Sequence, residues 1–254
     1  SDVCSSDLAE AATAAAATDI DLAEAAPSSP VPRAEVIEPD IGYIHVAEVT
    51  LAAVTDVDDA LRRFADAQAF AYVLDARYAG GDDYAAAAMI ASRFLPDHPE
   101  LFHIKHAERA AEVFRAEAAT ETAARQTTAP LMLLVNSRTR GSAEALVGAL
   151  RAQDRGIVLG SLTAGSAVTW KDIALPDGQV LRVASAKVVL QPADPQSLVT
   201  TAVFPGGIAP DIFVAIEPDV EHDVLFNPST NVTLTVSLQP TITKRRRSER
   251  SEEH

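Results

Sequence analysis

The stretch that decides the fold is LMLLVNSRTRGSAEALVGAL, residues 131–150. Its first five residues, 131–135, form a short continuous apolar run, which is typical of a strand buried on both faces. Residues 136–141 are polar and end in glycine, and residues 142–150 then repeat apolar side chains with a helical period. The stretch therefore predicts a buried strand, a polar loop and a helix, the repeating unit of an α/β fold.

The same alternation continues on both sides of this unit. Strands are predicted at 41–49, 70–76, 101–104 and 156–160, and helices from 55 onward, at 83–94 and at 106–125. Residues 168–174 and 179–190 flank Pro176-Asp177-Gly178, a turn signal between two strands. The pattern predicts a mainly parallel sheet with alternating helices and covered faces, plus a late antiparallel hairpin.

Composition limits the classes of function. The 254 residues carry 36 acidic and 21 basic side chains, and a net charge of −15 argues against a nucleic-acid partner. No stretch approaches the roughly 20 apolar residues of a membrane span. The single cysteine, Cys4, excludes an internal disulfide and a cysteine-rich zinc site.

The chain divides into a core with appendages. Residues 1–8 and 244–254 resemble translated adapter sequence and are left out of the fold argument. Residues 9–40 read as an alanine-rich leader with a proline-rich linker, and residues 41–216 as the α/β core. We expect a C-terminal extension at 217–243, with a strand at 231–236.

Four motifs in sequence order resemble the catalytic core of the C-terminal processing, or tail-specific, serine peptidases. They are Val73–Arg77 followed by Gly80-Gly81, Leu134–Asn136 leading to Ala143–Leu150, Gly160-x-x-Thr163-x-Gly165, and Gly207-Ile208-Ala209-Pro210-Asp211. The resemblance implies a core related to the crotonase and Clp protease folds. It also implies a peptide or protein C-terminus as ligand, no cofactor, and a periplasmic or extracytoplasmic location.

Peptidases of this family, as the resemblance implies, use a serine nucleophile with a lysine base. A serine hydroxyl needs an adjacent base, and a lysine acts as that base only when burial lowers its pKa from about 10.4. Two backbone N–H groups hold the oxyanion. The family motifs place these donors at Gly81 and Ser142.

This sequence departs from the family at both members of the catalytic pair. The nucleophile lies three residues before the helix glutamate and five after the strand-ending asparagine, and both counts give Gly141. The lysine follows the glycine that matches Gly165, and that position is Ser166. A glycine offers no nucleophile and a serine is no amine base, so the sequence predicts loss of the family's chemistry.

A shift of one residue would make Ser142 the nucleophile instead. The alternative interpretation of Ser142 is a helix N-cap. A nucleophilic Ser142 also needs a base, and the four lysines, Lys105, Lys171, Lys187 and Lys244, occupy strand or tail positions that favour solvated side chains.

Other candidate residues have structural readings. His98, His103 and His106 show no recurring ligand pattern, so no metal is expected. Asp75 and Arg77 are expected to form hydrogen bonds at a strand end, and a contact of Arg77 with a substrate carboxylate is the alternative. Trp170 is expected to pack against neighbouring side chains or, alternatively, to line a peptide groove.

Two functions of different classes remain open. One is a peptidase-like domain without catalysis that binds peptides or partner subunits, with an extended peptide along the strand edge near Ser166–Trp170. The other is an active serine peptidase that uses Ser142 with an unassigned base. A domain without any ligand is a third possibility, and the sequence does not define the oligomeric state.

Overall fold

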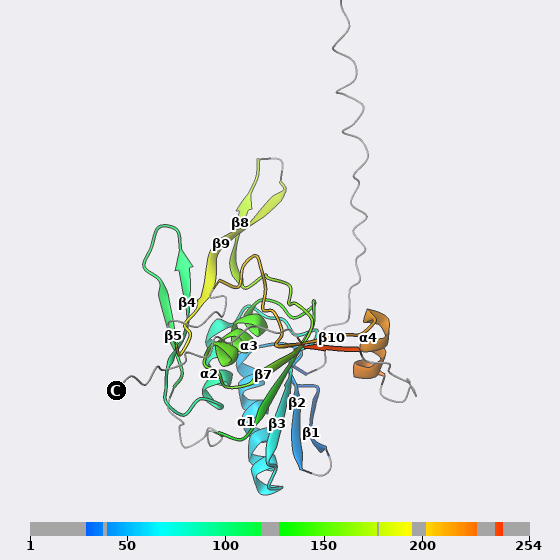
Figure 1. Cartoon of the computed structure of the whole chain (residues 1–254). Helices are drawn as coiled ribbons and strands as arrows, with labels where there is room; N and C mark the ends of the chain where they lie inside the picture. The colour runs from blue at the N-terminus through cyan, green and yellow to red at the C-terminus, as the bar shows by residue number, and fades with distance from the viewer. Residues whose placement is uncertain are drawn as a thin grey trace, which may run out of the picture.

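Two sheets organise the chain in this computed structural model (Figure 1). The described residues are 29–37, 40–117, 127–176, 178–194, 202–227 and 237–240. The larger sheet has the order β1-β2-β3-β6-β7-β10-β11, and the smaller one has the order β5-β4-β9-β8. In the larger sheet, β2, β3, β6, β7 and β10 run parallel, whereas β1 and β11 are antiparallel edge strands. The predicted α/β class, mainly parallel with a late antiparallel hairpin, is confirmed.

From residue 41 to residue 160, strands of the larger sheet alternate with helices as predicted. The strands are β1 (Arg33–Ile37), β2 (Ile41–His45), β3 (Ala71–Asp75), β4 (Glu100–His106), β5 (Glu112–Arg115), β6 (Leu131–Val135), β7 (Ile157–Gly160), β8 (Val168–Ala174), β9 (Val180–Leu190), β10 (Ile212–Ala215) and β11 (Ser237–Pro240). The helices are α1 (Leu51–Asp66), α2 (Tyr84–Ser92), α3 (Ser142–Ala152) and α4 (Pro218–Phe226).

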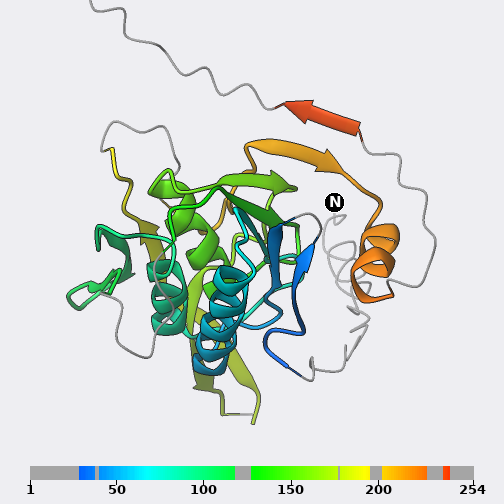
Figure 2. The same ribbon diagram turned by 90° about the horizontal axis from the view of Figure 1, so that it is seen from below.

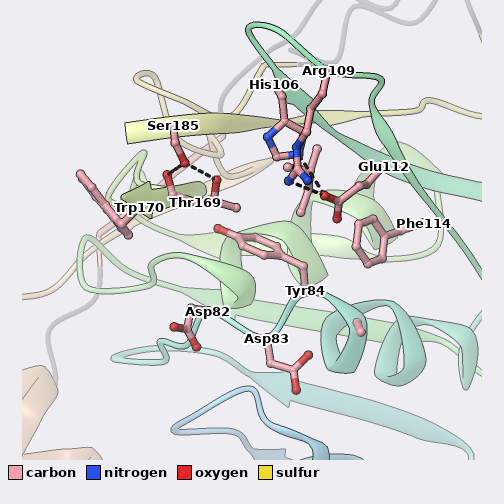
Figure 3. Close-up of a pocket in the computed structure, with 12 residues that line it drawn as sticks. Asp82, Asp83, Tyr84, His106, Arg109, Glu112, Phe114, Thr169, Trp170 and Ser185 are labelled. Atoms are coloured by element: carbon pink, nitrogen blue, oxygen red, sulfur yellow. Dashed lines mark hydrogen bonds and ion pairs between the residues drawn. The ribbon is translucent and has the colours of Figure 1, made fainter. Parts of the chain in front are cut away.

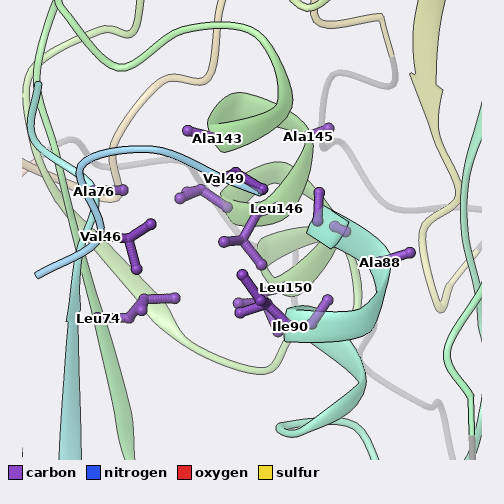
Figure 4. Close-up of a cluster of buried hydrophobic side chains, with 14 of the residues drawn as sticks. Val46, Val49, Leu74, Ala76, Ala88, Ile90, Ala143, Ala145, Leu146 and Leu150 are labelled. Carbon is purple, nitrogen blue, oxygen red and sulfur yellow. The ribbon is translucent and has the colours of Figure 1, made fainter. Parts of the chain in front are cut away.

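Helices α1, α2 and α3 pack together on one face of the larger sheet (Figure 2). Leu146 and Leu150 of α3 meet Ile90 of α2 and Leu74 of β3 in the core between these elements (Figure 4). Each of these four side chains is at most 1% exposed. The core therefore fixes the N-terminus of α3 above the carboxyl ends of the parallel strands, where the candidate site lies.

Two predicted elements differ from the structure. The helix expected from residue 55 begins at Leu51, because the hydroxyl of Thr50 accepts the N–H of Ala53 and caps it earlier. The helix expected at 106–125 is wrong over its described part. There, β5 pairs with β4 and Phe114 stacks on Phe102 with ring centroids 4.9 Å apart. Strand β1 and helix α4 were not expected.

Several expectations concern residues outside the described ranges. They are the leader at 9–26, the two chain ends and the strand at 231–236. Strand β11, which pairs with β10, lies directly after that last segment. The proposed boundaries at 40–41 and 216–217 remain predictions.

The smaller sheet presents β8 as an edge strand. The register between β8 and its partner β9 shifts at Thr169 and Trp170 of β8, which pair with Ala186 and Ala184 of β9 respectively. Ser185 is therefore the extra residue of a β-bulge.

Among the described residues, no helix is long and apolar enough to cross a membrane.

Candidate functional site

Two glycine loops meet at the N-terminus of α3. Gly81 follows β3 and has φ 127°, and Gly141 precedes α3 with φ 61°. The N–H of Ser142 donates to the carbonyl of Gly81 over 3.0 Å, and that of Arg140 donates to Ala79 over 2.9 Å. The loops are thus joined backbone to backbone, and the N–H of Ser142, one expected oxyanion donor, is engaged within the chain.

Glu144 holds a third segment against this junction. Its side chain is fully buried. One oxygen, Oε1, accepts the hydroxyl of Thr163 at 2.5 Å and the N–H of Gly165 at 2.6 Å. The other, Oε2, accepts the N–H of Ser166 at 2.7 Å and that of Gly141 at 3.2 Å, together with the Ser166 hydroxyl. A carboxylate can be buried when several donors replace its hydration, and these donors supply that replacement.

The shared oxygen of Glu144 brings Gly141 and Ser166 together. Two N–H groups on one acceptor can be no farther apart than the two bonds allow, so the positions are neighbours. The two positions are separated by 24 residues in the sequence. Counting from the motif residues assigns both to the family's catalytic pair. The space for a side chain at 141 is closed, however. A Cβ atom there would lie far inside van der Waals contact with the carbonyl oxygen of Gly81.

Ser142 is not the helix N-cap, so that interpretation is wrong. Gly141 occupies the cap position without a side chain, and Glu144 reaches back to its N–H. Ser142 is the first helical residue and is fully buried, and its hydroxyl has no hydrogen-bond partner among the described residues. A methylene-sized group on Gly81 would lie 2.7 Å from this hydroxyl, which faces the glycine loop directly.

The described lysines all lie on the surface. Lys105 and Lys187 are cross-strand partners on β4 and β9, and Lys171 is exposed on β8. Lys244 lies outside the described residues. Because the Ser142 hydroxyl is unpartnered, none of the described lysines serves it as a base in this arrangement.

Tyr84 links the junction to the smaller sheet. Its hydroxyl donates to the carbonyl of Val168 over 2.9 Å, where β8 begins two residues after Ser166. Burial raises the pKa of Tyr84, and the charges of Glu144 and Asp82 raise it further. This neutral phenol therefore acts as a hydrogen-bond donor that fixes the start of β8. The sequence did not predict a role for Tyr84. It identified Glu144 as a motif residue, but not the hydrogen bonds that Glu144 accepts.

A second polar network lies at the ends of β2, β3 and β6. Buried Asp75 accepts the hydroxyl of Tyr43 at 2.7 Å and the guanidinium of Arg77 at 2.6 Å. Arg77 also pairs with Glu221 of α4, and the Asn136 amide donates to Glu221 over 2.9 Å. The expected hydrogen bonds between Asp75 and Arg77 at the strand end are confirmed. Through Glu221, the same network holds α4 against the ends of these strands.

A groove of about 540 Å³ opens between α2 and the smaller sheet (Figure 3). Trp170 lines it and is 49% exposed. Asp82, Asp83 and Tyr84 form the α2 side, and His106, Arg109 and Glu112 form the far end (Figure 3). Of the described residues, no three His, Cys, Asp or Glu side chains are grouped to hold a metal ion.

The chain belongs to peptidase family S41, whose sequence model matches residues 40–214. Among its relatives, the carboxyl-terminal-processing protease of Synechocystis sp. is 31% identical over 149 residues, which are 58% of this chain and 33% of that protein. The chloroplastic C-terminal processing peptidase of Tetradesmus obliquus is 26% identical over 180 residues, or 71% of this chain and 36% of that protein. The chain thus spans about a third of the length of these relatives.

The fold agrees with that assignment. The solved structure of the photosystem II D1 C-terminal processing protease superposes with a TM-score of 0.55 at 24% identity, covering 76% of this chain and 47% of that one. The resemblance inferred from the four motifs is confirmed at the level of the family.

Proposed function

We propose that this family S41 domain binds peptides or protein C-termini without cleaving them. The observation that carries the proposal is the closed position at Gly141. It has no nucleophilic side chain, and the Gly81 carbonyl fills the space that one would need.

Two further observations support a non-catalytic site. The base position is Ser166, whose hydroxyl and N–H are both held by Glu144. Ser142 N–H donates to Gly81 rather than pointing to an open oxyanion position. A reacting carbonyl would therefore find neither an activated nucleophile nor this donor available.

Peptide binding is supported by the open edge of β8. An extended peptide can add to such an edge through main-chain hydrogen bonds, with alternate side chains entering pockets. Tyr84 fixes the first residue of β8, and the groove with Trp170 lies beside the strand. The arrangement thus offers a rigid edge and a place for a side chain.

Catalysis is tested with a fluorophosphonate probe on the full chain, followed by intact-mass spectrometry. We expect no adduct and no cleavage of unstructured peptides with free C-termini. The alternative function, an active peptidase that uses Ser142, is favoured by the buried and unpartnered Ser142 hydroxyl. An adduct that disappears in Ser142→Ala would establish the alternative and refute a non-catalytic domain.

Binding is tested with a fluorescein-labelled ten-residue peptide and a series in which single amides are N-methylated. We expect saturable binding of the unmodified peptide. N-methylation should weaken this binding only at alternate residues, because an edge strand forms hydrogen bonds with every second residue of its partner. Equal tolerance of N-methylation at all positions would show that the peptide does not bind as an added strand.

A further inference from the structure

The bulge at Ser185 builds one wall of the groove. Consecutive strand residues normally point to opposite faces, yet Thr169 and Trp170 both line the groove. The extra residue in β9 changes the pleat between them, and Ser185 is held there by a hydrogen bond to the Thr169 carbonyl. Figure 3 shows Trp170 and Asp82 toward the same end of the groove, away from Glu112 and Phe114. A large aromatic surface is thus presented to whatever lies beside β8.

The opposite wall is acidic. Asp83 caps α2 by accepting the N–H of Ala86, whereas Asp82 is exposed. Within the part of the chain that the structure describes, Asp82 forms no hydrogen bond or ion pair. Its carboxylate is therefore available to a cation in the groove.

The charges at the far end compensate one another. Arg109 lies 2.7 Å from Glu112 and 2.8 Å from the His106 ring, and His106 also bonds Glu112. The lining holds three carboxylates and one guanidinium, so the uncompensated charge is negative and lies on the α2 side.

Arg182 of β9 does not cancel that charge. It bonds both oxygens of Asp172 at 2.8 and 3.0 Å, and this pair is neutral as a unit. The hydrogen bonds that Arg182 donates to Asp172 chiefly raise the pKa of Arg182, and the charge of Asp82 raises it further at longer range.

We propose that the groove selects peptides with a lysine or arginine, whose aliphatic stem lies on Trp170 and whose cation meets Asp82. The inference rests on the proposed peptide binding and adds its specificity. A cation beside an indole face and a carboxylate satisfies both groups, whereas an apolar side chain would bury Asp82 without a partner. Exposed contacts of this kind are modest in strength, so we expect about tenfold selectivity.

The test compares two labelled ten-residue peptides that differ at one central residue, lysine or norleucine, by fluorescence anisotropy with the full chain. Norleucine keeps the length of the stem and removes the charge. We expect the lysine peptide to bind about tenfold more tightly at low salt, with the difference shrinking as salt is added.

Three variants locate the effect. Asp82→Asn and Trp170→Leu should each reduce affinity for the lysine peptide about three- to tenfold. Asp82→Asn should leave the norleucine peptide unchanged. The matched control is Asp97→Asn, which removes another exposed carboxylate, beyond the other end of α2. Thermal unfolding confirms that each variant is folded.

The outcomes separate the two proposals. Equal binding of both peptides, or an equal loss in Asp82→Asn and Asp97→Asn, overturns the selectivity while leaving peptide binding intact. Failure of both peptides to bind at millimolar concentration overturns the peptide-binding function itself, and the selectivity with it.

Discussion

At Gly141, the backbone conformation and the surrounding space both exclude a side chain. Its φ of 61° lies in the region that side chains rarely adopt, and a Cβ would collide with the Gly81 carbonyl. We therefore expect Gly141→Ser to lower the free energy of unfolding by about 2–3 kcal/mol, as strain and a displaced loop add. Urea unfolding followed by circular dichroism measures the change.

Gly206→Ser is the control for this substitution. Gly206 is exposed, and a Cβ there would meet no atom within 4 Å. We expect a change below about 0.5 kcal/mol. If Gly141→Ser changed the unfolding free energy as little as Gly206→Ser does, the junction would accommodate a side chain at position 141. The closed space would then not explain why this position lacks a nucleophile.

The sequence could place these residues but not their bonds. Counting from Asn136 and Glu144, and from Gly160, selects Gly141 and Ser166, and the structure makes them neighbours through Glu144. The bond from Ser142 to Gly81 is between backbone groups, which every residue carries. Motif spacing therefore finds the site but cannot tell whether it is open.

At the scale of elements, helix α4 covers the ends of the parallel strands. Phe226 packs edge-on against His45 and Tyr78, with ring centroids 5.9 and 5.5 Å apart. His45 is 3% exposed and its Nε2 lies 3.3 Å from the Arg77 carbonyl. A neutral imidazole that donates from Nε2 suits this position, whereas a charged ring would be desolvated.

This burial makes stability depend on pH. Burial lowers the pKa of His45 from its usual 6.5, although Asp75 opposes the shift. As pH falls below about 6.5, the unfolded chain takes up the proton before the folded chain does, so stability decreases. We expect His45 to contribute a loss of up to about 1.4 kcal/mol per pH unit between its unfolded and folded pKa values.

The measurement is the free energy of unfolding from pH 7.5 to 5.5 in the native chain and in His45→Gln. Glutamine can still donate to the Arg77 carbonyl but does not titrate. The native chain should show the steeper loss of stability below pH 6.5. Parallel curves would mean that His45 is protonated equally in both states, contrary to its burial.

The elements that sequence predicted well are those with strong local signals. Strands β3, β6 and β7 are apolar runs, and α2 follows the Gly80-Gly81 loop with Asp83 as its cap. Alanine content favours a helix locally and led to the helix expected at 106–125, which is wrong over its described part, residues 106–117. Pairing of β5 with β4 and the Phe102–Phe114 stack, which are tertiary contacts, decide otherwise.

At the scale of the whole molecule, the two faces of the larger sheet differ. The sequence predicts covered faces, and α1, α2 and α3 cover one of them (Figure 2). Val73, Met132 and Ile157 are register partners on adjacent strands, on the face opposite the buried Leu133. Met132 is 43% and Ile157 is 54% exposed, so this face presents apolar surface to its surroundings.

Such a face should promote association of the domain at high concentration. We expect Ile157→Lys to weaken self-association about tenfold in sedimentation velocity and to change the unfolding free energy by less than about 1 kcal/mol, because the side chain already reaches solvent. Leu51→Lys is the control, since Leu51 is 63% exposed at the start of α1 and lies off this face. Equal effects of both lysines would assign the association to net charge, and a loss above about 2 kcal/mol in Ile157→Lys would show that the folded protein buries this position.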